Sequence, residues 1–296
     1  MVTSDLNNSS PARPKISLVL SSGGLKPIAA VSLFEFLDEQ CIPVDLMVGC
    51  SAGSIISALR GTGYGTQEMI EFFQGVERFK PFDNIDYRAV LGLAKLPFGK
   101  FNMHSGILRP QKYRLILEET FGETRIEDLR PQVLMQTTDV STGEGVVLDK
   151  GRVCDALYAS SALFPLLPPI EIGGRWLSDG YYTSPLPVSE AVKHGMDVII
   201  AVTFFDPIDM DASSYTACLS NYYSIQGDAT TRYQMALSID MHTHEIIIIQ
   251  VPFKNPVNIW DVDYIPEIIE LGKIAVDARK KDILAAINHF YVTNRL

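Results

Sequence analysis

Two short apolar runs, each closed by glycine and serine and followed by a helical pattern, constrain this fold more than any other feature. Ile16–Leu20 leads into Ser-Ser-Gly-Gly, and Val44–Val48 leads into Gly-Cys-Ser-Ala-Gly. Strands buried between two layers of helices have such continuous apolar character. The repeated order of strand, loop and helix predicts an α/β fold, a three-layer α/β/α sandwich with a mainly parallel central sheet.

Similar patterns predict the later elements and a single domain. We expect helices over residues 66–79, 110–121, 154–162 and 265–290, and strands over 132–140, 144–148, 198–204 and 246–253. The first residues are rich in Ser, Asn and Pro and too polar to order themselves. We therefore expect a disordered polar tail over 1–14 and one domain over 15–296.

Composition limits the partners of the chain. Asp and Glu outnumber Lys and Arg by 35 to 25, so the basic surface that nucleic-acid binding needs is not expected. The four cysteines form no CxxC pair, and we expect neither a zinc site nor disulfides. The first residues lack the apolar core of a secretory signal, and no apolar run is long enough to span a bilayer. These features predict a cytoplasmic protein and leave export by a signal-less route open.

The segment Gly49–Gly53 fits G-x-S-x-G, the pattern of a nucleophile elbow. In such an elbow a serine lies on a sharp turn between strand and helix, where the helix amino terminus favours negative charge. The pattern alone is common, but here the expected strand precedes it and the expected helix follows it. We therefore predict that Ser51 is a nucleophile. Its neighbour Cys50 is expected to point into the sheet and to be unreactive.

A second glycine-containing loop, Ser22–Leu25, follows the first predicted strand. Glycine permits the close approach and the unusual φ angles with which backbone N–H groups point at an oxyanion. The loop has neither G-x-G-x-x-G nor a following GK[ST], which disfavours a nucleotide-binding function.

In their order along the chain, these motifs resemble the patatin-like phospholipase family. That family opens with a glycine-rich oxyanion loop, continues with G-x-S-x-G and later has D-G-G or D-G-A. Here Ser22–Pro27 resembles the loop, Ser51 the elbow serine and Asp179-Gly180 the aspartate motif. Residues 137–144 and 159–169 resemble the family's strand pair and its A-S-x-A-x-P stretch, so the resemblance covers residues 16–187.

This resemblance implies a patatin-like fold and a lipid acyl-hydrolase that works through a Ser–Asp dyad and an acyl-enzyme. Asp179 would take the proton of Ser51 directly, and burial would raise the pKa of Asp179 and strengthen it as a base. The N–H groups of Gly23, Gly24 and Leu25 would hold the oxyanion. No metal or other cofactor is required. The substrate would be a lipid or another acyl ester, and peripheral contact with a membrane stays open.

Four positions near these motifs have consequences of their own for the site. Lys26 stands where the family has a basic residue, and it either contacts a lipid head group or is a solvated lysine at a helix start. Ser22 replaces the first loop glycine and would be strained if its φ angle were positive. Pro27 removes one N–H group from the helix start, and Tyr181 replaces a small residue after Asp179-Gly180. None of these departures removes the nucleophile or the base.

Three other interpretations stay open at the level of the sequence. An α/β-hydrolase esterase with a Ser-His-Asp triad needs a histidine after the serine, for which His242 and His244 are candidates. The segment His242–Glu245 also places two histidines on one face of a strand, as a metal site could. The departures at Ser22 and Pro27 are compatible with a weakly catalytic patatin fold that serves as a lipid-binding module.

Residues 80–108 form an apolar segment interrupted by proline and glycine, which argues against one long helix. Because apolar residues are usually buried, we expect this segment to pack into the core. The competing hypothesis is that it covers the acyl channel and touches the bilayer, with Lys95 and Lys100 near lipid head groups.

Overall fold

The computed structural model describes residues 13–76, 81–205, 207–242, 245–257, 259 and 261–293. Of the polar tail expected over 1–14, residues 1–12 lie outside this part, and the expectation of a single domain stays a prediction.

The centre of the molecule is a twisted β-sheet. Within the described residues, eight strands form one sheet in the order β5-β6-β3-β2-β1-β7-β8, with β4 also paired to β3. The strands are β1 (Ile16–Leu20), β2 (Leu46–Cys50), β3 (Gln132–Asp139), β4 (Gly145–Leu148), β5 (Ile170–Ile172), β6 (Arg175–Asp179), β7 (Val198–Phe205) and β8 (Glu245–Pro252). Pairing from β3 through β2, β1 and β7 to β8 is parallel, whereas β4 and β6 run antiparallel to β3. The mainly parallel sheet is thereby confirmed.

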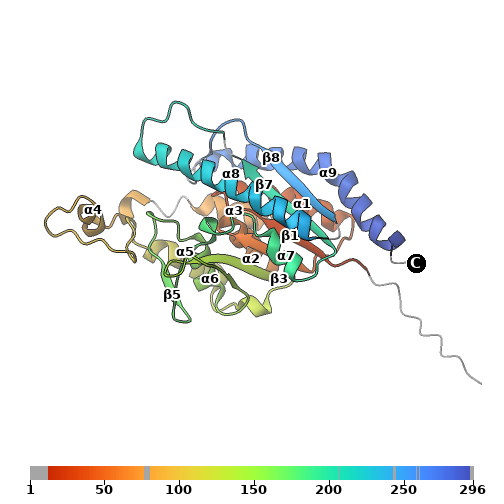
Figure 1. Cartoon of the computed structure of the whole chain (residues 1–296), viewed down its shortest axis with the longest axis horizontal. Coiled ribbons are helices and arrows are strands. Elements are labelled where there is room, and N and C mark those ends of the chain that lie inside the picture. Colours follow the sequence, from red (N-terminus) through yellow and green to blue (C-terminus); the bar gives the residue numbers. More distant parts are fainter. Residues whose placement is uncertain are drawn as a thin grey trace, which may run out of the picture.

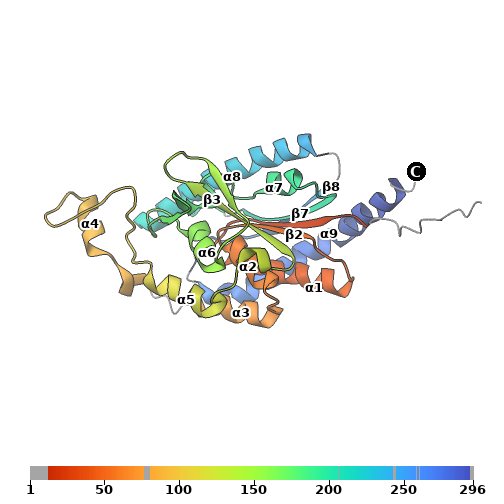
Figure 2. The ribbon, with the colours of Figure 1, turned by 90° about the horizontal axis from the view of Figure 1, so that it is seen from below.

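Helices cover both faces of this sheet (Figures 1 and 2). One face carries α7 (Val188–Lys193) and α8 (Tyr215–Met241). The other carries α1 (Val31–Glu39), α2 (Ala52–Gly61), α3 (Thr66–Gly75), α5 (Gln111–Phe121), α6 (Val153–Ser161) and α9 (Ile265–Thr293), while α4 (Tyr87–Leu93) projects from the body. Short 3-10 segments are η1 (Lys26–Ala30), η3 (Pro81–Asn84), η4 (Ile126–Asp128), η5 (Gly180–Tyr182) and η6 (Val262–Tyr264). The three-layer α/β/α architecture is therefore confirmed.

Alternate residues of β1 face two different hydrophobic clusters. Leu18 and Leu20 belong to the larger cluster, which includes residues of α1, α2 and α9. Val19 belongs to the smaller cluster, together with Val188 of α7. Because strand side chains alternate between faces, a strand covered on both sides needs apolar residues at consecutive positions. This requirement explains the unbroken apolar run from Leu18 to Leu20.

Besides β5, β6 and α7, which the sequence analysis does not predict, two elements near the site differ from the expectation. β2 begins at Leu46 rather than Val44, so Gly49 and Cys50 end the strand and the turn falls on Ser51 itself. The sequence analysis does not predict α8, because small or polar residues occupy its buried positions in place of an apolar stripe. These positions are Gly227, Thr231 and Ser238.

The expectation that residues 80–108 pack into the core is wrong for the central part of the segment. Leu93, Leu96 and Phe98 are 52%, 50% and 93% exposed. Both views show α4 and its following turn extending away from the sheet and its helices (Figures 1 and 2). Residue 80 itself lies outside the described residues.

The packing of α9 on η1 generates a first prediction. A Cβ atom on Gly272 would lie 2.4 Å from the carbonyl oxygen of Ala29, so Gly272→Ala should push α9 away from η1. We expect the free energy of unfolding, measured by urea denaturation, to fall by about 1–3 kcal/mol. Lys273→Ala, at an exposed neighbouring position, is the control and should change it by less than about 0.5 kcal/mol. A stabilised Gly272→Ala protein would contradict the close packing, because alanine is intrinsically the better helix former by about 1 kcal/mol.

Candidate active site

Ser51 lies at a strained turn between β2 and α2. Its backbone angles are φ 53° and ψ −125°, a conformation that residues other than glycine rarely adopt. The carbonyl of Ser51 accepts a hydrogen bond from the N–H group of Ser54 at 2.9 Å, which begins the helix. The side chain is thus presented at the carboxyl edge of the sheet and at the amino end of α2, where the helix dipole favours negative charge.

The two glycines of the motif are required by close contacts. A Cβ atom on Gly53 would lie 2.2 Å from the carbonyl oxygen of Leu20, at the end of β1. A Cβ atom on Gly49 would lie 2.4 Å from the backbone nitrogen of Ser54. No residue with a side chain fits at either position without moving the backbone. The G-x-S-x-G pattern therefore reflects how tightly α2 folds back on β1 and β2.

Asp179 reaches Ser51 across β3. In the parallel pairing of β2 with β3, Cys50 lies opposite Gln136, and in the antiparallel pairing of β3 with β6, Thr137 lies opposite Asp179. The serine and the aspartate therefore flank β3 at the same level of the sheet. The Ser51 hydroxyl donates a hydrogen bond of 2.8 Å to Oδ2 of Asp179.

Asp179 is 1% exposed, and its environment changes its acidity. Burial disfavours the charged form and raises the pKa of Asp179 to about 7. Hydrogen bonds from the N–H group of Tyr181, at 2.9 Å, and from Ser51 oppose this shift, because they favour the carboxylate. Near neutral pH this carboxylate is a much stronger base than an exposed aspartate.

Ser160 connects the strained turn to the sheet. Its fully buried hydroxyl accepts a hydrogen bond from the N–H group of Ser51 at 2.9 Å and donates one to the carbonyl of Gln136 at 2.7 Å. The hydroxyl of Ser54 lies 2.8 Å away. Sequence analysis gave Ser160 no role. The available signal was the resemblance of residues 159–169 to the A-S-x-A-x-P stretch.

The glycine loop after β1 lies beside this turn. The contact between Leu20 and Gly53 places the loop next to the start of α2. Gly24 has φ 61°, whereas Ser22 is not among the described residues with positive φ, so the strain considered for Ser22 does not arise. Within the described part of the chain, the N–H groups of Gly23, Gly24 and Leu25 donate no hydrogen bond. The loop can therefore offer backbone donors to a bound group.

Lys26 is only 5% exposed, with Nζ 5.9 Å from the ring centroid of Phe253. The interpretation of Lys26 as a solvated lysine is therefore wrong, and its contact with a lipid head group stays a prediction. Pro27 occupies the first turn of η1, as expected. The hydroxyl of Tyr181 donates a hydrogen bond to the carbonyl of Tyr223 on α8, so this residue attaches α8 to the Asp179 segment.

Cys50 is fully buried, as expected. Its Sγ atom lies 3.9 Å from Oδ1 of Asp179. Burial raises the pKa of the Cys50 thiol, and the adjacent Asp179 raises it further. The thiol therefore stays protonated next to the dyad.

His242, the triad candidate that the structure describes, does not lie at this site. His242 comes just before β8, whose first residue Glu245 pairs with Val198, and Val198 pairs with Ile16 at the start of β1. This is the amino edge of the sheet, whereas Ser51 lies at the carboxyl edge. A triad through His242 is therefore wrong, and His244 lies outside the described residues. The described residues also contain no group of three His, Cys, Asp or Glu side chains that could hold a metal ion.

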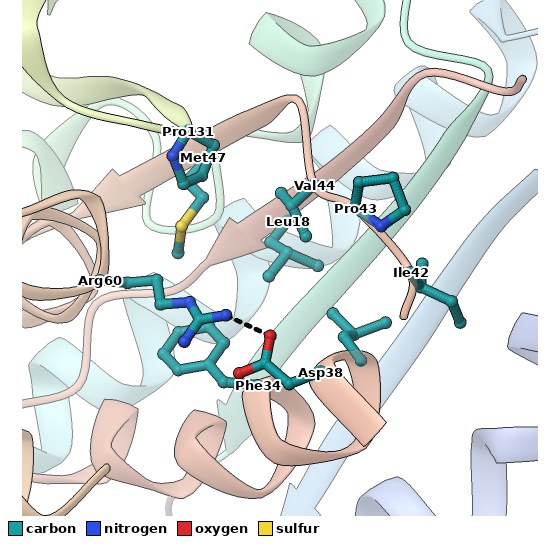
Figure 3. A pocket seen from close by; sticks show the side chains of 10 residues that line it. Leu18, Phe34, Asp38, Ile42, Pro43, Val44, Met47, Arg60 and Pro131 are labelled. Carbon is teal, nitrogen blue, oxygen red and sulfur yellow. Dashed lines mark hydrogen bonds and ion pairs between the residues drawn. The ribbon is translucent and has the colours of Figure 1, made fainter. Parts of the chain in front are cut away.

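A cavity of about 100 Å³ lies far from the dyad, at the amino end of β2 (Figure 3). It is bordered by Met47 and by an ion pair between Arg60 and Asp38, and the Arg60 guanidinium lies 5.4 Å from the ring centroid of Phe34. The cavity includes neither Ser51 nor Asp179.

Comparison with known proteins decides the family. A family model described as patatin-like phospholipase matches residues 18–192, more than half of the chain. The chain belongs to this family. The chain therefore has the patatin-like fold, and the resemblance of its sequence motifs to this family is confirmed.

Two curated relatives of this patatin-like chain are fungal. The lysophospholipase NTE1 of Saccharomyces cerevisiae is 29% identical over 210 residues, and lysophospholipase nte1 of Aspergillus fumigatus is 30% identical over 210 residues. Each alignment covers 71% of this chain but only 12% and 13% of the relative. Among solved structures, VipD from Legionella pneumophila aligns over 90% of this chain and 66% of its own, with a TM-score of 0.52. Its sequence is only 11% identical, so the similarity is one of fold. None of the helices in the described part of the chain is both long and apolar enough to cross a membrane.

The raised pKa of Asp179 predicts a pH-dependent cost in stability. Between about pH 4 and pH 7 the folded chain binds more protons at this group than the unfolded chain, so its contribution is present at low pH and lost as pH rises through about 7. Asp179→Asn cannot ionise. Its free energy of unfolding relative to the wild type, measured in urea, should be higher at pH 8 than at pH 5 by about 2–3 kcal/mol. Asp149→Asn, at an exposed position, should show no such difference, and an equal difference in both variants would refute the buried-charge account.

The contacts of Ser160 predict a positioning role. Ser160→Ala removes the acceptor that holds the N–H group of Ser51, so kcat for an ester substrate should fall about tenfold or more while KM changes little. The control is Ser32→Ala, which removes another largely buried serine hydroxyl, one that bonds the carbonyl of Ile269. Both variants should lose about 1–3 kcal/mol of stability at most, but only Ser160→Ala should lose kcat. Unchanged kcat in a folded Ser160→Ala protein would show that the serine is merely structural.

Proposed function

We propose that this chain is a lipid acyl-hydrolase that cleaves carboxylic esters with Ser51 as nucleophile and Asp179 as base. The observation that carries the proposal is the 2.8 Å hydrogen bond from the Ser51 hydroxyl to a buried carboxyl group whose pKa is raised to about 7. Membership of the patatin-like phospholipase family supports it. Because two relatives are named lysophospholipases, a phospholipid with a single acyl chain is the first substrate to test.

In the first step, Oγ of Ser51 attacks the acyl carbon while its proton passes to Oδ2 of Asp179. The strained backbone of Ser51, the hydrogen bond from its N–H group to Ser160 and the hydrogen bond from its hydroxyl to Asp179 position the nucleophile before substrate arrives. Such preorganisation lowers the entropic cost of reaching the transition state. The carbonyl oxygen of the ester becomes an oxyanion, for which the N–H groups of Gly23, Gly24 and Leu25 are the proposed donors.

Collapse of the tetrahedral intermediate breaks the ester bond, and the leaving alcohol takes the proton from Asp179. The acyl group then remains on Ser51. A water molecule gives its proton to the ionised Asp179 and attacks the acyl carbon, and the second collapse releases the fatty acid and returns the proton to Ser51. Asp179 thus acts as base and then as acid in each half of the reaction, which suits a pKa near the operating pH.

Substitution of either dyad residue should abolish turnover. Ser51→Ala and Asp179→Asn should each lower kcat for a chromogenic short-chain ester by at least about a thousandfold, and the double variant should lose no more than either single one. Since Asp179 must be ionised to act as base, kcat/KM should fall as pH drops below about 7 and level off above it. Steady-state kinetics from pH 5 to pH 9 would measure this profile.

His242→Ala serves as the control and should keep most of the activity, because His242 lies at the opposite edge of the sheet. Full activity of Asp179→Asn would exclude the dyad. A wild-type protein that binds lipid but hydrolyses no acyl ester would instead support the lipid-binding module.

A further inference from the structure

The turn that follows α4 presents apolar side chains to solvent. Leu93, Leu96 and Phe98 are 52%, 50% and 93% exposed, and the intervening residues are exposed as well. We refer to residues 93–100 as the α4 tip. It lies at the end of a projection that both views show extending from the body (Figures 1 and 2). A soluble chain rarely exposes several large apolar side chains together without a binding role.

The backbone of the α4 tip is held in a closed turn. The N–H group of Leu96 donates to the carbonyl of Leu91 at 3.0 Å, and the N–H group of Gly99 donates to the carbonyl of Leu96 at 3.1 Å. Gly99 packs so closely on Gly92 that a Cβ atom would lie 2.3 Å from the Gly92 nitrogen. Phe98 has φ 66°, a left-handed conformation that is strained for an aromatic residue. Phe98 is therefore directed outward by a built turn, and such local strain is concentrated at functional sites.

The charge of this projection differs from that of the rest of the chain. Residues 87–106 contain Arg88, Lys95 and Lys100 but no Asp or Glu, although the whole chain has a net charge of −10. All three basic residues are exposed. Apolar side chains flanked by lysine fit the interface of a bilayer that contains anionic lipid, where the chains enter the acyl boundary and the ammonium groups meet head groups.

The projection is attached to the segment before β6 and to β6 itself, the strand that Asp179 ends. The N–H groups of Ile107 and Leu108 donate to the carbonyls of Pro165 and Leu166 at 2.8 and 2.9 Å. His104 stacks on Trp176 of β6, with ring centroids 3.9 Å apart, and Asp179 ends the same strand. The parallel strands also point their carboxyl ends toward α4 (Figure 2). A membrane bound to the α4 tip would therefore lie at the same end of the molecule as Ser51.

We propose that the α4 tip docks this protein on an anionic bilayer surface, with Leu93, Leu96 and Phe98 inserted and Lys95 and Lys100 at the head groups. Docking would bring membrane lipid to Ser51, and this consequence rests on the proposed function. The docking itself is independent of the proposed function.

The experiment is co-sedimentation with vesicles, using the Ser51→Ala protein so that binding is separated from turnover. Vesicles of phosphatidylcholine and phosphatidylglycerol, about seven parts to three, supply the anionic surface, and pure phosphatidylcholine vesicles supply the neutral one. Replacing Leu93, Leu96 and Phe98 by Ser should reduce partitioning to the anionic vesicles about tenfold or more, because three apolar side chains no longer enter the membrane. Phe98→Ser alone, at a 93% exposed position, should lose part of this binding.

Lys95→Gln and Lys100→Gln should each weaken binding to the anionic vesicles about fivefold and leave binding to neutral vesicles unchanged. The matched control replaces three exposed apolar residues of α9, Ile274, Leu284 and Val292, by Ser, and it should bind like the parent protein. Thermal unfolding would check that every variant is folded.

Equal binding by the parent, the tip variants and the control would overturn the proposal. Absence of vesicle binding by the parent would also overturn it, and would leave a protein partner as the occupant of the α4 tip. If Ser51→Ala binds vesicles while the wild type hydrolyses no ester, docking stands and the proposed function fails.

Discussion

The first turn of α2 lies so close to the end of β1 that no Cβ atom fits between Gly53 and the carbonyl of Leu20. This contact fixes where α2 begins, and it forces the chain between β2 and α2 through the strained conformation of Ser51. The Ser160 hydroxyl then links the N–H group of Ser51 to the carbonyl of Gln136 on β3. Because β3 also pairs with β6, the strand that steadies Ser51 is the one that sets the position of Asp179. Ser51 and Asp179 therefore both lie at the ends of sheet strands, which holds their side chains to a narrow range of geometry.

Burial gives Asp179 its chemistry at a cost in stability. A carboxyl group with a pKa of about 7 favours its neutral form, so the folded chain is less stable at high pH than it would be with an uncharged residue there. Hydrogen bonds from Tyr181 and Ser51 offset part of that cost. The same burial makes Asp179 a stronger base near neutral pH, which is the property that the proposed dyad needs. Stability is commonly lost in this way where a site must hold a reactive charge.

The α4 tip differs in composition from the chain as a whole. The whole chain has a net charge of −10, whereas the α4 tip combines exposed apolar side chains with two lysines and has no acidic residue. An anionic bilayer would repel the net charge of the chain and attract the lysines of this projection. Such a distribution favours a single orientation at the membrane, in which the carboxyl edge of the sheet and the Ser51 turn face the lipid.

The sequence by itself determined the parallel strands, the Ser51 turn and the glycine loop, because each depends on residues a few positions apart. It identified Asp179 through a resemblance to a family, and it did not identify Ser160, whose bond to Ser51 joins residues 109 positions apart. Only the tertiary structure brought Ser51 and Asp179, 128 positions apart, into contact, since the register of β2, β3 and β6 decides that distance. The structure also placed His242 at the far edge, revealed α8 and exposed Phe98. Apolar periodicity reports which residues share a face, but what that face meets depends on elements distant in the chain.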